Sequence, residues 1–285
     1  MPLTVSHPAA VLGLARFGLL PSALVIGSMV PDLPFFVPFP VGGSVTHAPL
    51  GVVSVDLVAG LVSFVIWHAV LVRPFLAVAP AGLRHRLSAD LPLGLRPHLA
   101  TPRSAGLVVA SLVVGGYTHV GWDAFTHTGR WGSRHIPWLT RTHQLLGARQ
   151  WAEHRWPGYQ WIDFSSPGVH WAQYASGVGG ALIIAGWMLW WWRHTPPTAD
   201  LPPGLPAAHR GISVSVWVTV LGATAVAVAT GVLAVFGPGQ SIYRGGRGGV
   251  VDAAYLAVTR GGAACIVATL LAALAWHAYP PARRP

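Results

Sequence analysis

The stretch PLGVVSVDLVAGLVSFVIWHAVLV, residues 49–72, is apolar over a length that can cross a bilayer. A membrane-spanning helix needs about 20 mostly apolar residues. Further segments of this kind follow it: residues 105–122, 175–192, 212–236 and 261–278. We therefore predict an all-α, polytopic helical membrane protein with four or five transmembrane helices. Two shorter N-terminal helices are expected before them, over residues 8–20 and 21–31.

The overall composition agrees with a protein that sits in lipid. Of the 285 residues, 53% are hydrophobic and 9% are charged, whereas soluble domains carry roughly 25% charged residues. The net charge of +10 comes from arginines alone, because the chain has no lysine, and they are spread among the connecting loops. Arginine-rich loops beside apolar spans commonly orient a protein in the membrane and contact lipid headgroups. We expect membrane lipids as partners and no nucleic acid.

A proline-rich stretch divides the chain. Residues 1–192 contain nearly all the side chains with candidate chemistry, and we predict that they form one helical domain. Residues 193–211 are predicted to be a linker, because prolines are frequent there. Residues 212–285 are predicted to form a C-terminal pair of transmembrane helices with little chemistry of its own.

The motif GGYTHVGWDAFTHTG, residues 115–129, places polar side chains at the end of an apolar run. His119, Asp123 and His127 are four residues apart, and residues at i and i+4 lie on one face of a helix. One helix can offer two metal ligands in this way. The same spacing also suits a local hydrogen-bonded pair, so the spacing by itself leaves both interpretations open.

Three further stretches carry histidine or aspartate beside apolar sequence. They are TVSHPAAV with His7, GSMVPDLPFF with Asp32, and VTHAPLGV with His47, which Asp56 follows nine residues later. Carboxylates are costly in apolar surroundings unless they are paired or bind a metal. A set of His and Asp side chains suits a divalent ion such as zinc, manganese or iron. The set contains no cysteine, which argues against a structural zinc site.

The order of the segments predicts that these side chains converge. His47 opens the first long span, and His119 and Asp123 close the next one. If the two spans run antiparallel, these ends meet at the same side of the membrane. His7 and Asp32 lie on the N-terminal segments, which enter from that side too. We therefore predict one shared His/Asp cluster near one membrane face.

Taken together, SHPAAV, GSMVPDLPFF, THAPLG and GGYTHVGWDAFTHTG resemble the motifs of domain-of-unknown-function family 4184, a family of bacterial membrane proteins. A later stretch, QYASGVGG at residues 173–180, fits a further block of that family. The same order is similar to that of proteins classed as membrane-bound metal-dependent hydrolases and, more remotely, to zinc-dependent phospholipase C. The resemblance covers residues 1–192 and implies a location in the bacterial cytoplasmic membrane.

The resemblance also implies a set of metal ligands, carried over motif by motif. They are His7, Asp32, His47, His119 and Asp123, with His127 and Asp56 as further candidates. Thr46 and Thr118 each precede a candidate histidine and are expected either to support it by a hydrogen bond or to be ordinary helix hydroxyls. At Ala48 the chain departs from the family, in which Thr-His is usually followed by serine. The chain therefore lacks the serine hydroxyl that could support His47, but His47 itself remains a predicted ligand.

The function expected from this set is hydrolysis of a phosphoester or a lipid-like substrate. A bound divalent ion, with zinc as the first expectation, would activate water. Asp32 or Asp123 is the candidate general base, and Arg130 and Arg134 could hold an anionic headgroup. Two other functions stay open. One is a non-catalytic membrane protein with a structural metal site or a buried His/Asp network, and the other is a metal or proton transporter.

Overall fold

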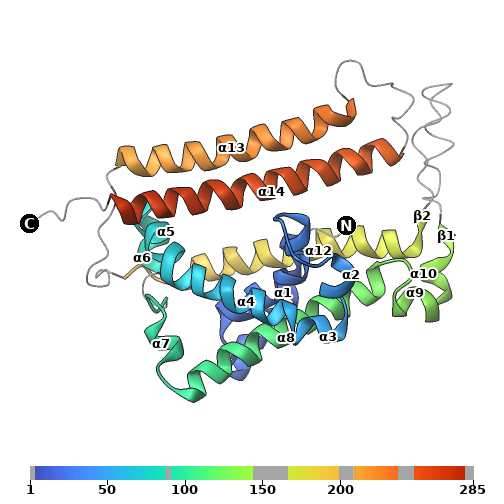
Figure 1. Ribbon diagram of the computed structural model, residues 1–285, viewed down its shortest axis with the longest axis horizontal. Helices are drawn as coiled ribbons and strands as arrows, with labels where there is room; N and C mark the ends of the chain where they lie inside the picture. Colours follow the sequence, from blue (N-terminus) through green and yellow to red (C-terminus); the bar gives the residue numbers. More distant parts are fainter. Residues whose placement is uncertain are drawn as a thin grey trace, which may run out of the picture.

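The computed structural model consists almost entirely of helices (Figure 1). It describes residues 4–87, 91–143, 166–198, 208, 210–236 and 247–279. In these residues, five segments are long and apolar enough to cross a membrane: Pro49–Val78, Pro102–His135, Gly168–His194, Arg210–Val235 and Asp252–Ala278. The predicted all-α polytopic membrane fold is therefore confirmed.

The helices follow one another along the chain with short connections. The α-helices are α1 Pro21–Met29, α2 Gly43–Thr46, α3 Pro49–Val52, α4 Val55–Val65, α5 Val72–Val78, α6 Ala81–Leu87, α7 Arg96–Leu99, α8 Pro102–Thr126, α9 Trp131–His135, α10 Pro137–Thr140, α12 Gly168–His194, α13 Arg210–Phe236 and α14 Arg247–Ala278. The 3-10 segments are η1 Thr4–Val11, η2 Leu14–Phe17 and η3 Val30–Phe35, and a π-helical stretch, η4, covers Ile66–Leu71. Strands β1 Thr142–His143 and β2 Ser166–Pro167 form a short antiparallel pair.

The N-terminal segment differs from its prediction. One helix was expected over residues 8–20, but the chain forms the two 3-10 segments η1 and η2. Pro8 lies inside η1, where it has no backbone N–H to donate. Gly13 separates the segments, and Gly18 ends the second with a left-handed φ of 80° that glycine adopts without strain. This irregular backbone carries His7 into the interior, where it is 1% exposed.

The first and last spans also differ from their predicted forms. The first is not one regular helix, because Val53 and Ser54 separate α3 from α4 and the π-helical η4 follows α4. The last span begins at Asp252 and not near residue 261. Arg260 is accommodated inside α14 because its Nη1 donates a 2.9 Å hydrogen bond to the carbonyl of Thr230. The helix therefore continues through a charge that was expected to limit it.

α1 crosses α8 at a point where two glycines leave room for close contact. A Cβ atom at Gly27 would overlap the backbone carbonyl of Leu112, and one at Gly115 would overlap that of Leu24. The two backbones are therefore in direct contact, as in close helix pairs of other membrane proteins. The apolar core beside this crossing contains Ala23, Phe64, Val108 and Leu112. The crossing holds the last turns of α8 against the N-terminal segments.

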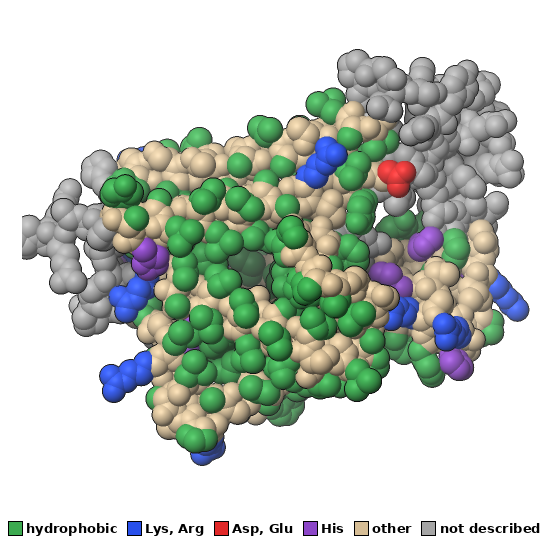
Figure 2. All heavy atoms as spheres, in the orientation of Figure 1, with side chains coloured by type: hydrophobic (Ala, Val, Ile, Leu, Met, Phe, Trp, Pro, Cys, Tyr) green, Lys and Arg blue, Asp and Glu red, His purple; other side chains and the backbone are tan. Residues whose placement is uncertain are grey.

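The C-terminal helices α13 and α14 pack on each other and lie along one side of the remaining helices (Figure 1). Two hydrogen bonds anchor them: Trp217 Nε1 donates to the carbonyl of Val78 at 3.0 Å, and His277 Nε2 lies 3.0 Å from that of Val70. Figure 2 shows hydrophobic side chains over most of the visible face, with arginine and histidine side chains mostly towards its two ends. Such a surface suits contact with lipid tails between two headgroup layers. The division of the chain into domains stays a prediction.

Candidate metal centre

The predicted cluster forms, and it draws on several elements. His7 comes from η1, Asp32 from η3 and His47 from the end of α2, while α8 supplies His119 and Asp123. These five side chains are all buried. His127 follows α8 directly and is the accessible member, with 30% of its side chain exposed. The predicted convergence is therefore confirmed, while the role of these residues as metal ligands stays a prediction.

Each of two histidine nitrogens lies at a distance that suits a shared metal ion from the other nitrogen and from two carboxylate oxygens. His47 Nε2 is 3.2 Å from Asp32 Oδ1 and 3.3 Å from Asp123 Oδ2. His119 Nε2 is 3.6 Å from Asp32 Oδ1 and 3.5 Å from Asp123 Oδ2, and the two Nε2 atoms are 3.3 Å apart. Tetrahedral donors at about 2.0–2.1 Å from zinc are about 3.3–3.4 Å from each other. These donors, which we call the inner set, therefore fit a divalent ion.

Both histidines of the inner set are held through their other nitrogen. His119 Nδ1 lies 2.8 Å from the carbonyl of Ser28, and His47 Nδ1 lies 2.9 Å from that of Gly43. A ring nitrogen facing a carbonyl must carry the proton, because the carbonyl can only accept. This fixes both rings with Nε2 towards the cluster, as the outer contacts of metal-bound histidines do.

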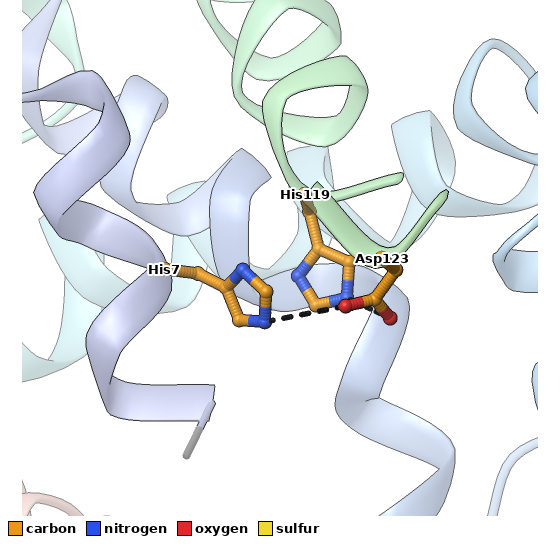
Figure 3. Close-up of side chains that lie close together, drawn as sticks. All are labelled: His7, His119 and Asp123. Atoms are coloured by element: carbon orange, nitrogen blue, oxygen red, sulfur yellow. Dashed lines mark ion pairs between the residues drawn. The ribbon is translucent and has the colours of Figure 1, made fainter. Parts of the chain in front are cut away.

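A second group of atoms contacts the other carboxylate oxygen of Asp123. Figure 3 shows one of its members, His7, beside His119 and Asp123. Asp123 Oδ1 is 3.8 Å from His7 Nε2 and 3.4 Å from His127 Nδ1. The ring of His7 stacks on that of His119, with 3.9 Å between the centroids. Neither nitrogen of His7 has a hydrogen-bond partner in the described part of the chain. We call His7, His127 and Asp123 Oδ1 the outer set.

Hydrogen bonds and burial set the charges of the cluster. Burial lowers the pKa of His47, but its hydrogen bonds to Asp123 and Asp32 outweigh burial and raise the pKa to about 9. Burial raises the pKa of Asp32, yet the bond to His47 and further contacts outweigh this and lower it. Burial, aided by the charge of His119, lowers the pKa of His7 to about 4. Without a metal, a proton therefore sits on His47 between two carboxylates.

This proton makes the stability of the metal-free protein depend on pH. The folded pKa of about 9 lies above the ordinary value of 6.5, so the stabilisation is complete below pH 6.5 and is lost as the pH rises through 9. We expect the loss to be on the order of 3 kcal/mol. A zinc-loaded protein should not show it, because a metal ligand is already deprotonated. Unfolding temperatures of chelated and zinc-loaded protein, measured from pH 6 to 9.5, should diverge with pH; parallel curves would contradict the assignment.

The other predicted polar residues divide into two groups. Thr46 supports the cluster, because its Oγ1 donates at 2.7 Å to a carbonyl of η3 and lies 3.0 Å from His47 Nδ1. Arg130 supports it from outside, since its Nη1 donates at 2.9 Å to the carbonyl of His47. Thr118 is an ordinary helix hydroxyl that donates at 2.7 Å to a carbonyl of α8. Of the two roles predicted for Thr118, the structure shows the ordinary helix hydroxyl.

Asp56 is buried near the cluster but does not join it. The residue is 4% exposed, and neither carboxylate oxygen has a hydrogen-bond partner among the described residues. His47 and His119 act on it only through their charges. Asp56 lies in the first turn of α4, and the prediction that it is a further ligand receives no support from a direct contact.

Sequence reasoning missed two residues that touch the cluster. Thr4 Oγ1 donates a 2.6 Å hydrogen bond to Asp32 Oδ2. Its spacing of three residues from His7 was a usable signal, because residues i and i+3 lie on one side of a 3-10 helix. Gln173 of α12 is buried, and its Nε2 lies 3.4 Å from His127 Nε2. It was noted only as part of a family block.

Comparison with known proteins places the chain in a family. A family model described as a domain of unknown function, DUF4184, matches residues 1–274. The match includes every residue of the cluster and extends through α13 into α14. No curated protein and no solved structure matches the chain. Because the family model covers nearly the whole sequence, the chain belongs to the domain-of-unknown-function family DUF4184.

Proposed function

We propose that this chain is a membrane-bound hydrolase that depends on a divalent metal ion, with zinc as the first expectation and manganese or iron as alternatives. The observation that carries the proposal is the inner set, with five donor–donor distances of 3.2–3.6 Å. Hydrogen-bond networks also bring such groups together. A hydrogen-bond network, however, does not require two histidines to point their Nε2 atoms at each other. Here both do, and the Nδ1 atom of each is held by a backbone carbonyl.

The residues of the cluster would hold the ion and receive a proton. A bound divalent ion lowers the pKa of water to about 7 and polarises a phosphoryl or acyl oxygen. Of the two candidate bases, Asp32 has its Oδ2 taken by Thr4. Asp123 Oδ1 instead faces the half-exposed His127. Asp123 is therefore the proposed proton acceptor, and His127 the route to solvent.

The proposed substrate is a phosphoester, most directly one carried by a lipid. The cluster lies among segments apolar enough to cross a membrane, so a substrate in the bilayer can approach it without leaving the lipid. Arg134, on α9 just beyond the cluster, is exposed and free to contact an anionic headgroup. The proposed location is the bacterial cytoplasmic membrane.

A structural metal site is the second candidate. The inner set has four buried protein donors, and closed four-ligand sites are typical of structural zinc.

Activity measurements on the full-length protein in detergent micelles would test the proposal. A generic phosphodiester and vesicles of phosphatidylglycerol or phosphatidylcholine serve as substrates, after removal of metals with a chelator. We expect hydrolysis to stop with the chelator and to return with zinc or manganese. Protein that binds the ion tightly and hydrolyses none of these substrates would favour the structural role instead.

A further inference from the structure

The two carboxylate oxygens of Asp123 face two different groups of histidines. Oδ2 is directed at His47 and His119, at 3.3 and 3.5 Å. Oδ1 is directed at His7 and His127, at 3.8 and 3.4 Å. A carboxylate that only accepts hydrogen bonds does not require its two oxygens to face separate groups of histidines. A carboxylate that bridges two metal ions does require this, because each oxygen then binds its own ion.

We propose that the cluster holds two divalent ions bridged by Asp123, one in the inner set and one in the outer set. This inference rests on the metal dependence proposed above and adds the number of ions and their separate roles. The inner set is complete, with four donors that are all buried. The outer set has three donors, one of them half-exposed, and so leaves a position open to water and substrate.

His7 provides the independent support for the outer ion. Its side chain is 1% exposed, yet both ring nitrogens lack a hydrogen-bond partner among the described residues. A buried imidazole without a partner is unfavourable, and a metal ion on Nε2 would supply one. His7, His119 and Asp123 also offer donor atoms that all lie within 4.8 Å of one another. His119 Nε2 already belongs to the inner set, so we assign the outer ion to His7 and His127, whose ring nitrogens lie 3.8 and 3.4 Å from Asp123 Oδ1.

The number of ions changes the expected chemistry of the site. Two divalent ions against the carboxylates of Asp32 and Asp123 leave an excess of positive charge, whereas one ion is neutralised by them. An excess of positive charge favours an anionic phosphodiester over a neutral ester, and paired ions are a common arrangement in phosphoester hydrolysis. With two ions, both oxygens of Asp123 are ligands, and this replaces the role of proton acceptor that a single ion would leave to Asp123 Oδ1.

The test is the number of zinc ions bound per chain. Full-length protein in detergent, carrying Cys265→Ser so that the partly buried thiol does not contribute, is stripped with a chelator and titrated with zinc. We expect two ions for this background and one for His127→Ala, which changes only the outer set. His135→Ala is the matched control, since this exposed ring contacts Trp131 instead, and it should keep two. One ion in the unaltered cluster overturns the second site alone, and no ion overturns the metal-dependent function as well.

A spectroscopic readout separates a lost ion from a damaged fold. With manganese in place of zinc, two ions bridged by one carboxylate should give an exchange-coupled electron paramagnetic resonance spectrum. His127→Ala should give the spectrum of an isolated ion while retaining the unfolding temperature of the His135→Ala control. An isolated-ion spectrum at every loading of the unaltered cluster would refute the bridge.

Discussion

Asp123→Ala is expected to weaken zinc binding by at least about 100-fold and to abolish hydrolysis. Loss of a group that only supports a ligand already costs about 10- to 100-fold in metal affinity, and Asp123 contributes a donor itself. Its Oδ2 lies 3.3 Å from His47 Nε2 and 3.5 Å from His119 Nε2. Removing it leaves the inner set with three donors and one carboxylate charge. Zinc affinity is measured by competition with a chelator of known affinity.

Two variants make this result specific. Asp123→Asn keeps the shape of the side chain and removes its charge, so it should lose most of the affinity while changing the packing little. Asp252→Ala removes an exposed carboxylate of α14 and should bind zinc as the unaltered protein does. Unchanged affinity in Asp123→Ala would mean that the cluster is a hydrogen-bond network and not a metal site.

Gly115→Val is expected to destabilise the protein by about 3 kcal/mol or more, because it places a branched side chain where two backbones touch. A Cβ atom there would overlap the carbonyl of Leu24 and would lie 2.8 Å from the backbone nitrogen of Ser28. To relieve this, α8 must move away from α1. The 2.8 Å contact of His119 Nδ1 with the carbonyl of Ser28 would then be lost. Zinc affinity should therefore fall together with stability.

The matched control lies on the same helix. A Cβ atom at Gly121 meets nothing within 4 Å, so Gly121→Ala should leave stability unchanged or raise it by about 0.5–1 kcal/mol. Unfolding in detergent, followed by circular dichroism, gives both values. Equal stability of Gly115→Val and Gly121→Ala would show that the contact of α1 with α8 does not hold the cluster in place.

Patterns in the amino-acid sequence predict the class of fold and the residues that converge. Apolar segments of spanning length predict membrane helices because lipid leaves few other ways to satisfy the backbone. The spacing of His119 and Asp123 predicts a shared helical face, because it depends only on local geometry. Because the first two spans run antiparallel, His47 at the start of the first span is predicted to lie near His119 and Asp123 at the end of the second. Local periodicity failed at η1, where Pro8 and Gly13 interrupt regular winding.

The division of the cluster into two sets depends on how the helices pack in three dimensions. No pattern in the sequence indicates that the two oxygens of Asp123 face separate histidine pairs, or that Thr118 turns away from the cluster while Thr46 supports it. These facts depend on how closely α1 approaches α8 at Gly27 and Gly115. That distance is set by the packing of segments far apart in the chain, whereas a sequence motif reports only what lies within a few turns of itself.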